Sequence, residues 1–294
     1  MITSESIICC VCLDSSDTLI QLCHDPISAR FTCKPCLLQY IDQKLSHAFP
    51  GTCPALTCPC HGKQLMDYTK LIELLPYEYI QRYAHLANSI LIFLCGACHN
   101  SRSIAVDYDP TSVHEAETKV LEKLLFFSKK QEIDFEQCKG QFLSHLHEYC
   151  AGIINVESFF EHCRRYFFEL SSGTETEAMQ ILSNILRLIQ NPERRNLLHL
   201  RFLNERPRFY TPCCTRLHCF RCKTKDFHDD KTCEENTSTL DSSIIACPSC
   251  NIHLAKADGC NSVSCVCGVQ FSWSNELDVR YFIQSKIMSY SWDL

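Results

Sequence analysis

The order of apolar and polar positions predicts one long helical block in the middle of the chain. Between about residues 113 and 204, apolar side chains recur every three or four positions, a spacing that places them on one face of a helix. The clearest runs are Phe135, Cys138, Phe142, Leu146 and Tyr149, then Ile153, Val156, Phe160, Cys163, Phe167 and Leu170. This pattern predicts four or five helices that pack on one another.

Three helix starts can be read from the same block. Two of them have the capping-box spacing, in which Ser or Thr is followed three positions later by Glu. They are Ser112 with Glu115 and Thr174 with Glu177. A third start is predicted where Asn191 precedes Pro192, because Asn is a good N-cap and Pro is tolerated in the first turn.

The cysteines and three of the histidines inside this block have spacings that fit no zinc site. We expect the cysteines, which lie on the predicted apolar faces, to be small core residues. We expect the histidines to be solvated or packed. These residues are Cys138, Cys150 and Cys163, with His145, His147 and His162.

Outside the block, closely spaced cysteines replace the helical periodicity. Of the 294 residues, 24 are Cys, 13 are His and only 8 are Gly. The N-terminal residues lack the basic start and apolar run of a signal peptide, and no apolar stretch approaches the ~20 residues of a membrane span. We therefore expect a cytoplasmic protein of about two domains whose thiols bind metal, with zinc as the default ion, rather than form disulfides.

The charge balance argues against nucleic acid as a partner. The chain has 28 Lys and Arg against 34 Asp and Glu, for a formal charge of −6. A chain that binds a phosphate backbone neutralises it with an excess of basic side chains. We therefore expect protein partners, and neither nucleic acid nor a membrane span.

The first cysteine zone holds eight potential zinc ligands within about fifty residues. A C-x2-C pair allows a tight backbone turn that brings both sulfurs to one tetrahedral ion, and two such pairs close a structural site. The eight residues are Cys9, Cys12, Cys23, His24, Cys33, Cys36, Cys53 and Cys58. Their order predicts two interleaved sites rather than two consecutive fingers.

The middle zone is split by the helical block. Its second half has the spacing C-x2-C-x5-H-x4-C, in Cys219, Cys222, His228 and Cys233. The remaining ligands are Cys95, Cys98, Cys213 and Cys214. They either complete one module with the second half or form an isolated site beside a separate clip, and both interpretations use the same residues.

The third zone has one cysteine more than a zinc site needs. Four sulfurs can close one tetrahedral site, and they belong to Cys247, Cys250, Cys265 and Cys267. Cys260 lies between the pairs, next to turn-forming residues that present it on a loop. A thiolate in such a place is a candidate nucleophile. The alternatives are a spare structural thiol, or a ligand for which Cys265 or Cys267 has been mistaken.

These motifs together resemble the RING-in-between-RING ubiquitin ligases. The likeness also includes Cys53-Pro54 with Cys58 four residues later, the amphipathic stretch at residues 71–83, and the run at residues 247–273. It covers about two thirds of the chain. It implies small zinc-stabilised modules (RING-like, in-between-RING and catalytic RING-like) with an all-α helical insertion and about five zinc ions.

The resemblance also implies domain boundaries. These are a first RING-type module with its following helix at residues 1–92, an in-between-RING module at 93–233 split by the helical insertion at about 110–207, a catalytic RING-like module at 240–275, and a C-terminal tail at 276–294.

In that family, the first module docks a ubiquitin-charged conjugating enzyme, and the cysteine after a glycine in the last module accepts ubiquitin as a thioester. The position of this nucleophile is held here by Cys260, and His253 is the candidate base. The acceptor is then an amine of a protein substrate. The apolar candidates for docking the conjugating enzyme are Ile8, Val11, Leu13 and Pro54.

The chain departs from the family at three places. His24 lies nine positions before Cys33, a longer gap than usual, so Cys10, Cys60 and His61 are alternative ligands. The family's His two positions after the nucleophile is replaced by Ser262. Finally, Ser272 and Asn275 stand where the family has cysteines, so we expect the second zinc of the last module to be absent, with packing of Phe271, Trp273, Tyr281 and Phe282 in its place.

Two other function classes remain open on sequence alone. The first is a non-catalytic zinc-binding adaptor that binds a conjugating enzyme or ubiquitin without transferring it. The second is a zinc-stabilised scaffold whose helical block binds an unrelated partner. The scarcity of glycine and the short last module suggest a pathogen protein that works in a host cytosol.

Overall fold

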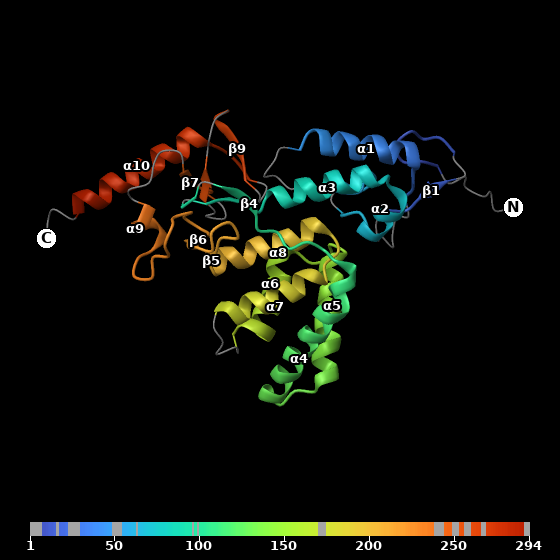
Figure 1. Ribbon diagram of the computed structural model, residues 1–294. Coiled ribbons are helices and arrows are strands. Elements are labelled where there is room, and N and C mark those ends of the chain that lie inside the picture. The colour runs from blue at the N-terminus through green and yellow to red at the C-terminus, as the bar shows by residue number, and fades with distance from the viewer. Residues whose placement is uncertain are drawn as a thin grey trace. The chain divides into compact units, whose positions relative to one another are not determined.

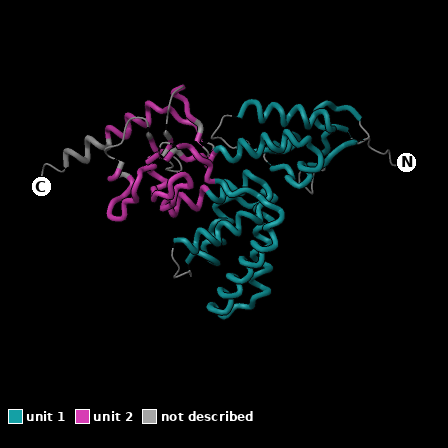
Figure 2. Tube along the Cα trace, in the orientation of Figure 1, with its two compact units in different colours: residues 1–89, 105–199 teal, residues 90–104, 200–294 magenta. Residues whose placement is uncertain are grey.

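The computed structural model in Figure 1 describes most of the chain. The described residues are 8–15, 18–22, 30–48, 55–62, 64–95, 97–98, 100–169, 175–237, 244–248, 253–255, 260–265 and 269–290. The chain divides into two compact units (Figure 2). The first unit is Met1–Ser89 with Ala105–His199, and the second is Ile90–Ile104 with Leu200–Leu294.

The first cysteine zone folds around three helices in the first unit. Strands β1 (Leu19–Ile20) and β2 (Thr32–Cys33) pair antiparallel, and helices α1 (Lys34–Ser46), α2 (Tyr68–Leu74) and α3 (Tyr77–Ser89) follow. Helix α1 starts where the chain leaves β2, with Cys33 as an extended N-cap and a proline in the first turn. The buried side chains of this zone form one cluster, which includes Leu22, Leu37, Ile41, Leu71 and Tyr83.

The predicted helical block is confirmed, and it belongs to the same unit. A short 3₁₀ turn (Pro110–Ser112) leads into α4 (Val113–Gln131), α5 (Phe135–Cys150), α6 (Val156–Cys163), a π-helical turn (Arg164–Phe168), α7 (Glu175–Arg187) and α8 (Pro192–Glu205), which continues into the second unit. Its core is aromatic: Phe142, Tyr149 and Phe159 are fully buried. The rings of Tyr149 and Phe159 stack with their centroids 4.7 Å apart.

The cysteines and histidines of the block lie as the apolar pattern predicts. Cys138 and Cys163 are buried, and Cys150 is partly buried. Burial raises the pKa of Cys138 and that of Cys150, the latter to about 11, which keeps both as neutral thiols. The rings of His145 and His162 stack at 3.6 Å.

The helix caps follow the prediction at one position and differ at another. Asn191 accepts a hydrogen bond from the Glu193 N–H at 2.9 Å, so the predicted cap of α8 is confirmed. The capping box predicted at Ser112 is wrong, because the Ser112 side chain makes no cap hydrogen bond. Asp109 caps the preceding 3₁₀ turn instead, accepting from Thr111 N–H at 2.9 Å. Thr174 lies outside the described residues.

Buried polar contacts join the helical block to the first cysteine zone. The Tyr83 hydroxyl of α3 donates to Glu193 Oε2 of α8 at 2.9 Å, and Asn196 Nδ2 donates to Asn88 Oδ1 at 2.7 Å. Both members of the first pair are at most 5% exposed. Buried polar groups fix a single arrangement because each needs its partner, so the block and this zone form one body.

The described part of the second unit consists of two-stranded antiparallel sheets, two helices and the end of α8. Its elements are β3 (Ile92–Leu94) with β4 (Ser101–Ser103), β5 (Arg208–Tyr210) with β6 (Leu217–Cys219), α9 (Cys233–Thr237), β7 (Ile244–Ala246) with β8 (His253–Ala255), β9 (Ser262–Ser264) with β10 (Gln270–Ser272), and α10 (Trp273–Tyr290). Most of the segment expected as a C-terminal tail therefore belongs to α10. Phe93, Phe209 and Phe220 form a small aromatic cluster, with the first two rings edge to face at 4.6 Å.

Among the described residues, no helix combines the length and the apolar character needed to cross a bilayer.

Candidate metal centres and the Cys260 loop

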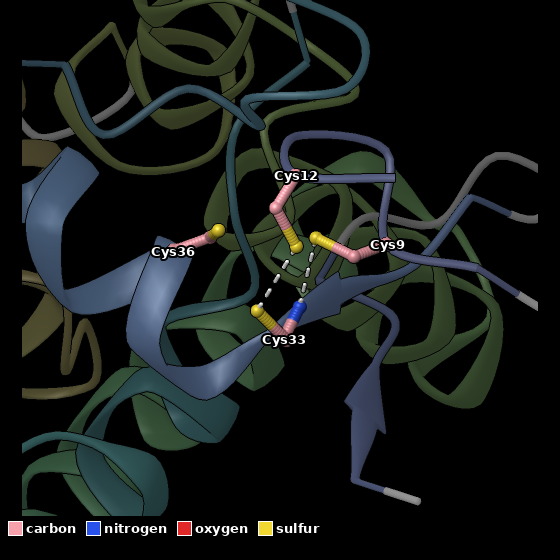
Figure 3. A group of neighbouring side chains, drawn as sticks. All are labelled: Cys9, Cys12, Cys33 and Cys36. Carbon is pink, nitrogen blue, oxygen red and sulfur yellow. Dashed lines mark hydrogen bonds between the residues drawn. The ribbon is translucent and has the colours of Figure 1, made fainter. Parts of the chain in front are cut away.

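The first candidate metal centre lies in the first unit, where a turn, a strand end and a helix start converge (Figure 3). Cys9 and Cys12 flank the turn, Cys33 ends β2 and Cys36 lies in the first turn of α1. The four sulfurs lie within 4.8 Å of one another, and Cys12 Sγ is 3.9 Å from Cys33 Sγ. Two thiolates on a tetrahedral zinc ion are about 3.8 Å apart. The group therefore fits a four-coordinate ion.

Backbone N–H groups stabilise a thiolate in this group. The amides of Cys33 and Val11 donate to Cys9 Sγ at 3.3 and 3.4 Å. Burial raises the pKa of Cys9, but the N–H groups around it outweigh burial and hold that pKa at about 6. Contact with the Cys33 side chain, together with burial, raises the pKa of Cys36 to about 12. A bound zinc ion would displace the protons that remain on these thiols, since zinc binds thiolates.

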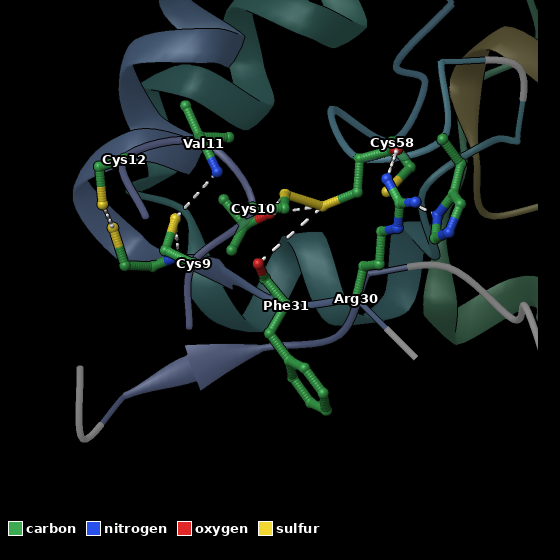
Figure 4. The surroundings of a disulfide bond; sticks show 11 residues. Cys9, Cys10, Val11, Cys12, Arg30, Phe31 and Cys58 are labelled. Atoms are coloured by element: carbon green, nitrogen blue, oxygen red, sulfur yellow. Dashed lines mark hydrogen bonds between the residues drawn. A yellow bond between two sulfur atoms is a disulfide. The ribbon is translucent and has the colours of Figure 1, made fainter. Parts of the chain in front are cut away.

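The other four ligands predicted for the first zone are only partly described. Cys23, His24 and Cys53 lie outside the described residues, and Cys58 is buried. Cys10 and Cys60 form a disulfide, with their Cα atoms 6.0 Å apart (Figure 4). The expectation of metal rather than disulfides is therefore wrong for this pair.

The disulfide also bears on the alternatives to His24. It takes up the sulfurs of Cys10 and Cys60, so neither is a free thiol. His61, the third alternative, has Nδ1 at 3.7 Å from Cys58 Sγ. A sulfur and a nitrogen on one tetrahedral zinc ion are about 3.6 Å apart. The distance between His61 Nδ1 and Cys58 Sγ is thus close to the distance expected between two ligands of one zinc ion.

The second candidate centre joins residues more than a hundred positions apart in the second unit. Cys95 follows β3, whereas Cys213 and Cys214 lie in the turn between β5 and β6. Cys95 Sγ is 3.6 Å from Cys214 Sγ, and Cys98 Sγ is 3.4 Å from Cys213 Sγ. The structure thus brings together the two pairs that the helical block separates in sequence, an arrangement consistent with both interpretations of the middle zone.

Two polar residues beside this centre were not identified from the sequence. His218 Nε2 lies 3.6 Å from Cys95 Sγ, and Thr211 Oγ1 lies 3.4 Å from Cys214 Sγ. Both residues are buried. Their sequence positions give only a weak signal, namely a polar side chain on each strand flank of the Cys213–Cys214 turn. Polar groups that contact the ligands in this way orient them towards a metal.

A thiolate is also favoured in the second centre. Burial raises the pKa of Cys95, yet the backbone N–H groups of Cys98 and Ala97 and the Cys214 side chain hold that pKa at about 5. The Cys95 thiol therefore gives up its proton more readily than an ordinary cysteine, as a zinc ligand must.

The third candidate centre contains the predicted histidine. Cys219 ends β6, Cys233 starts α9, and Cys222 and His228 lie in the connection between them. Cys219 Sγ is 3.7 Å from Cys233 Sγ, and Cys222 Sγ is 3.2 Å from His228 Nε2. His228 Nδ1 is 2.7 Å from the Lys231 carbonyl oxygen. A proton on Nδ1 leaves Nε2 free to bind a metal, which is the usual arrangement of a histidine ligand.

The zinc set predicted for the third cysteine zone is described only in part. Cys247 and Cys265 are both buried, at 0% and 2% exposure. Cys250 and Cys267 lie outside the described residues. The zinc centre predicted at these residues therefore remains a prediction.

Cys260 is an exposed thiol two residues before β9. None of the three metal groups found among the described residues includes it. The Ser262 N–H donates to its Sγ at 3.5 Å. The next residue anchors the loop: Asn261 O accepts from Trp273 N–H at 2.7 Å and Asn261 Oδ1 accepts from Ser274 N–H at 2.8 Å. The side chain of His253, the predicted base, lies outside the description.

The last module has polar and apolar side chains near the positions where the resemblance implies a second zinc site. Ser272 stands where the family has a zinc-binding cysteine, and it accepts a hydrogen bond from Asn261 Nδ2 at 3.0 Å. Trp273 is buried and Phe271 is partly buried. Tyr281 and Phe282, on α10, are 52% and 63% exposed, so more than half of each side chain remains outside any such packing.

The residues predicted to dock a conjugating enzyme form an exposed apolar edge on the first centre. Ile8, Val11 and Leu13 are 45%, 49% and 68% exposed around the Cys9–Cys12 turn. Leu13 has a positive φ of 64°, which a Leu rarely adopts. Pro54 lies outside the described residues.

No protein-family model matches the chain, and no curated protein is detectably similar to it in sequence.

Proposed function

We propose that the chain is a zinc-dependent ubiquitin ligase of the RING-in-between-RING type that carries ubiquitin on Cys260. The observation that supports this most is the exposure of Cys260 on an anchored loop, outside the three metal groups formed by described residues. A thiol that served only structure would gain by burial or by ligation. An exposed thiol on a fixed loop is instead available to a large substrate.

The proposed reaction consists of two acyl transfers. The Cys260 thiolate attacks the carbonyl carbon of the thioester that joins ubiquitin to the conjugating enzyme, and the enzyme's thiolate leaves with the bonding electrons. A substrate amine then attacks the new thioester, loses its proton to solvent or to a base such as His253, and expels the Cys260 thiolate. Thioester exchange is nearly balanced in free energy, so the protein contributes mainly by positioning the reactants.

The cysteine groups would supply the framework for this reaction. The three described groups each provide four ligands of the kind that zinc binds in closed structural sites. With the second site of the first zone and the site at Cys247 and Cys265, the proposed content is about five zinc ions. The exposed edge of Ile8, Val11 and Leu13 is the proposed docking surface for the conjugating enzyme. Because the nucleophile must remain reduced, the proposed location is the cytoplasm, or a host cytosol for a pathogen protein.

The helical block is the proposed site of substrate recognition. The zinc modules already have roles in the scheme, whereas this block has a core of its own and packs on the first cysteine zone. A block held in one arrangement can present a substrate to the conjugating enzyme docked beside it.

A non-catalytic adaptor is the second candidate, and one observation favours it. Ser262 stands where the family has a histidine, and its backbone N–H donates to Cys260 Sγ. An adaptor would keep the docking edge and the metal groups and would not form a thioester.

The test is an intact-mass assay of the full chain with activating enzyme, conjugating enzyme and ubiquitin. The proposal expects one ubiquitin adduct that thiols remove. Cys260→Ser should give an adduct that resists thiols but is cleaved by hydroxylamine, because an oxyester replaces the thioester. Cys260→Ala should give none.

Cys150→Ser is the matched control, because Cys150 is a partly buried thiol outside the three metal groups. It should form the adduct as the unaltered chain does. No adduct on the unaltered chain, or an adduct that persists in Cys260→Ala, overturns the ligase. If the conjugating enzyme still binds in that case, and Leu13→Ala weakens that binding, the protein is an adaptor.

A further inference from the structure

A cavity of about 510 Å³ opens in the first unit, away from the cysteine groups. It lies between helices α2 and α3, residues 107–108 and the start of α8. Its apolar wall is formed by Ile72, Leu75 and Ile80, and its polar lining includes Tyr68, Asp107 and Arg195. Its volume lies within the range of about 300–1,000 Å³ typical of small-molecule sites, which combine apolar walls with a few polar groups.

Arg195 is the unusual member of this lining, because its guanidinium is only partly satisfied. The residue is 4% exposed. Its two hydrogen bonds both leave from Nη1, to the carbonyl oxygens of Ile189 at 2.9 Å and Gln190 at 3.2 Å. Its Nε is buried and has no partner among the described residues. A buried charged donor without an acceptor is costly, and such a group in a folded protein calls for an explanation.

Tyr68 adds a second donor beside Arg195. Burial raises the pKa of Tyr68 to about 12, although the Arg195 charge opposes this, so the phenol keeps its proton at neutral pH. A neutral hydroxyl can donate to an anion. Asp107 is an exposed residue of the lining. Its negative charge raises the pKa of Arg195 and so opposes the effect of burial.

We propose that this cavity binds a small organic acid, whose carboxylate pairs with Arg195 and Tyr68 and whose apolar body lies against Ile72, Leu75 and Ile80. A guanidinium presents parallel N–H donors that match the two oxygens of a carboxylate. Two carbonyl oxygens hold Nη1 in place, so little side-chain entropy remains to be lost on binding. This site goes beyond the proposed ubiquitin chemistry and does not depend on it.

Asp107 makes the sign of the ligand's charge testable. A carboxylate in the cavity gains from Arg195 and is opposed by Asp107, whereas an ammonium ligand would have the reverse preference. Because Asp107 is exposed, its replacement by Asn should not disturb the packing of the unit. The response to that change therefore separates an acid site from a cation site.

The experiment uses three probes with the same body: hydrocinnamate, hydrocinnamamide and phenylpropylamine. Binding to the full chain is followed by ligand-observed NMR and titration calorimetry. Hydrocinnamate should bind about tenfold more tightly than the amide, because a hydrogen bond to a charged group is stronger than one between neutral groups. The amine should bind most weakly.

Two variants and a control locate the site without removing a buried group. Asp107→Asn should tighten hydrocinnamate binding about two- to fivefold, as expected for one exposed like charge in the lining of the same cavity. Ile72→Glu, at a residue 36% exposed in the lining, should abolish it. Glu73→Gln, next to it on α2 but outside the lining, should leave it unchanged apart from a minor charge effect.

Equal affinity for the three probes, or tighter binding of the amine, overturns the acid site. So does hydrocinnamate binding that survives Ile72→Glu in a protein whose circular dichroism and thermal unfolding match the unaltered chain. Arg195→Lys gives a further readout, since lysine keeps the positive charge but lacks the parallel N–H donors of the guanidinium. It should reduce hydrocinnamate affinity while the weak amide binding stays the same, and an equal loss for both would also contradict the proposal.

Discussion

Helix α8 buries four polar side-chain atoms that have no hydrogen-bond partner among the described residues, on Arg194, Arg195, Asn196 and His199. Arg195 Nε and His199 Nδ1 are both buried without a hydrogen-bond partner among the described residues. The first lines the cavity described above, and the second lies in packed surroundings, where the residue is 3% exposed. Burial lowers the pKa of His199 to about 4, because a charged imidazolium cannot be solvated there.

This histidine predicts a loss of stability in mild acid. Its pKa in the folded chain is about 4, against about 6.5 in the unfolded chain. Between those values the unfolded chain binds the extra proton, so the free energy of unfolding falls as the pH drops from about 6.5 towards 4. We expect a loss of about 2 kcal/mol between pH 7.5 and about pH 5 from this residue. Urea unfolding at the two pH values measures it.

Metal release in acid also lowers the free energy of unfolding, and variants distinguish that effect from the titration of His199. His199→Leu, of similar volume, should remove about 2 kcal/mol of the pH dependence and leave the remainder. His114→Gln, at an exposed position, should keep the full dependence. A His199→Leu protein with the pH dependence of the unaltered chain would show that His199 titrates normally.

At the residue scale, sequence spacing identified ligands better than it identified their surroundings. The C-x2-C pairs and His228 converge as predicted because short spacing forces neighbouring sulfurs towards one point. His218 and Thr211 were missed because their contacts to Cys95 and Cys214 depend on the pairing of β5 with β6. The pairing of Cys10 with Cys60 was missed for a similar reason, since it depends on how the turn at Cys9–Cys12 packs on the rest of the zone.

At the scale of elements, the turn after α5 depends on one glycine. Gly152 has φ of +75°, and a Cβ built on it would lie 2.6 Å from Leu65 Cδ1. Leu65 belongs to the first cysteine zone, so this close approach is part of the joint with the helical block. Both the backbone angle and the space therefore exclude a side chain here.

The prediction is that Gly152→Ala lowers the free energy of unfolding by about 2–4 kcal/mol, from left-handed strain plus overpacking. The matched control is Gly140→Ala, inside α5, where a Cβ meets nothing within 4 Å. It should raise that free energy by about 0.5–1 kcal/mol, because alanine favours a helix interior. Denaturation followed by circular dichroism measures both, and equal effects of the two substitutions would contradict the argument.

The helices themselves were the most predictable elements. Period 3.6 in the apolar positions locates α5 and α6 because each buries one face in a common aromatic core. The start of α4 was less predictable. Ser112 has the right spacing to Glu115, but Asp109 supplies the local hydrogen bonds one turn earlier. Asp109 and Ser112 are both residue types that can cap a helix, and their sequence alone does not decide between them. The conformation of the loop that leads into the helix decides it.

At the scale of the whole molecule, the two units are stabilised in different ways. The first has large apolar clusters in addition to one cysteine group. The described part of the second holds two cysteine groups, two-stranded sheets and a cluster of three phenylalanines. The sequence predicted the contrast between helical and cysteine-rich segments. It did not predict that the helical block would join the first cysteine zone in one body, because that depends on buried contacts such as Tyr83 with Glu193.

This contrast predicts an uneven response to metal removal. A two-stranded sheet is marginally stable by itself, and metal binding in small modules is coupled to folding. Stripping the full chain with a zinc chelator should therefore expose the amides of β5 and β6 to fast hydrogen exchange, since both strands adjoin two cysteine groups. The amides of α5 and α6 should stay protected, because Phe142, Tyr149 and Phe159 form a core that contains no metal ligand. Added zinc should restore the protection of β5 and β6. If native mass spectrometry shows that the metal has left while β5 and β6 remain protected, the cysteine groups do not stabilise the second unit through metal.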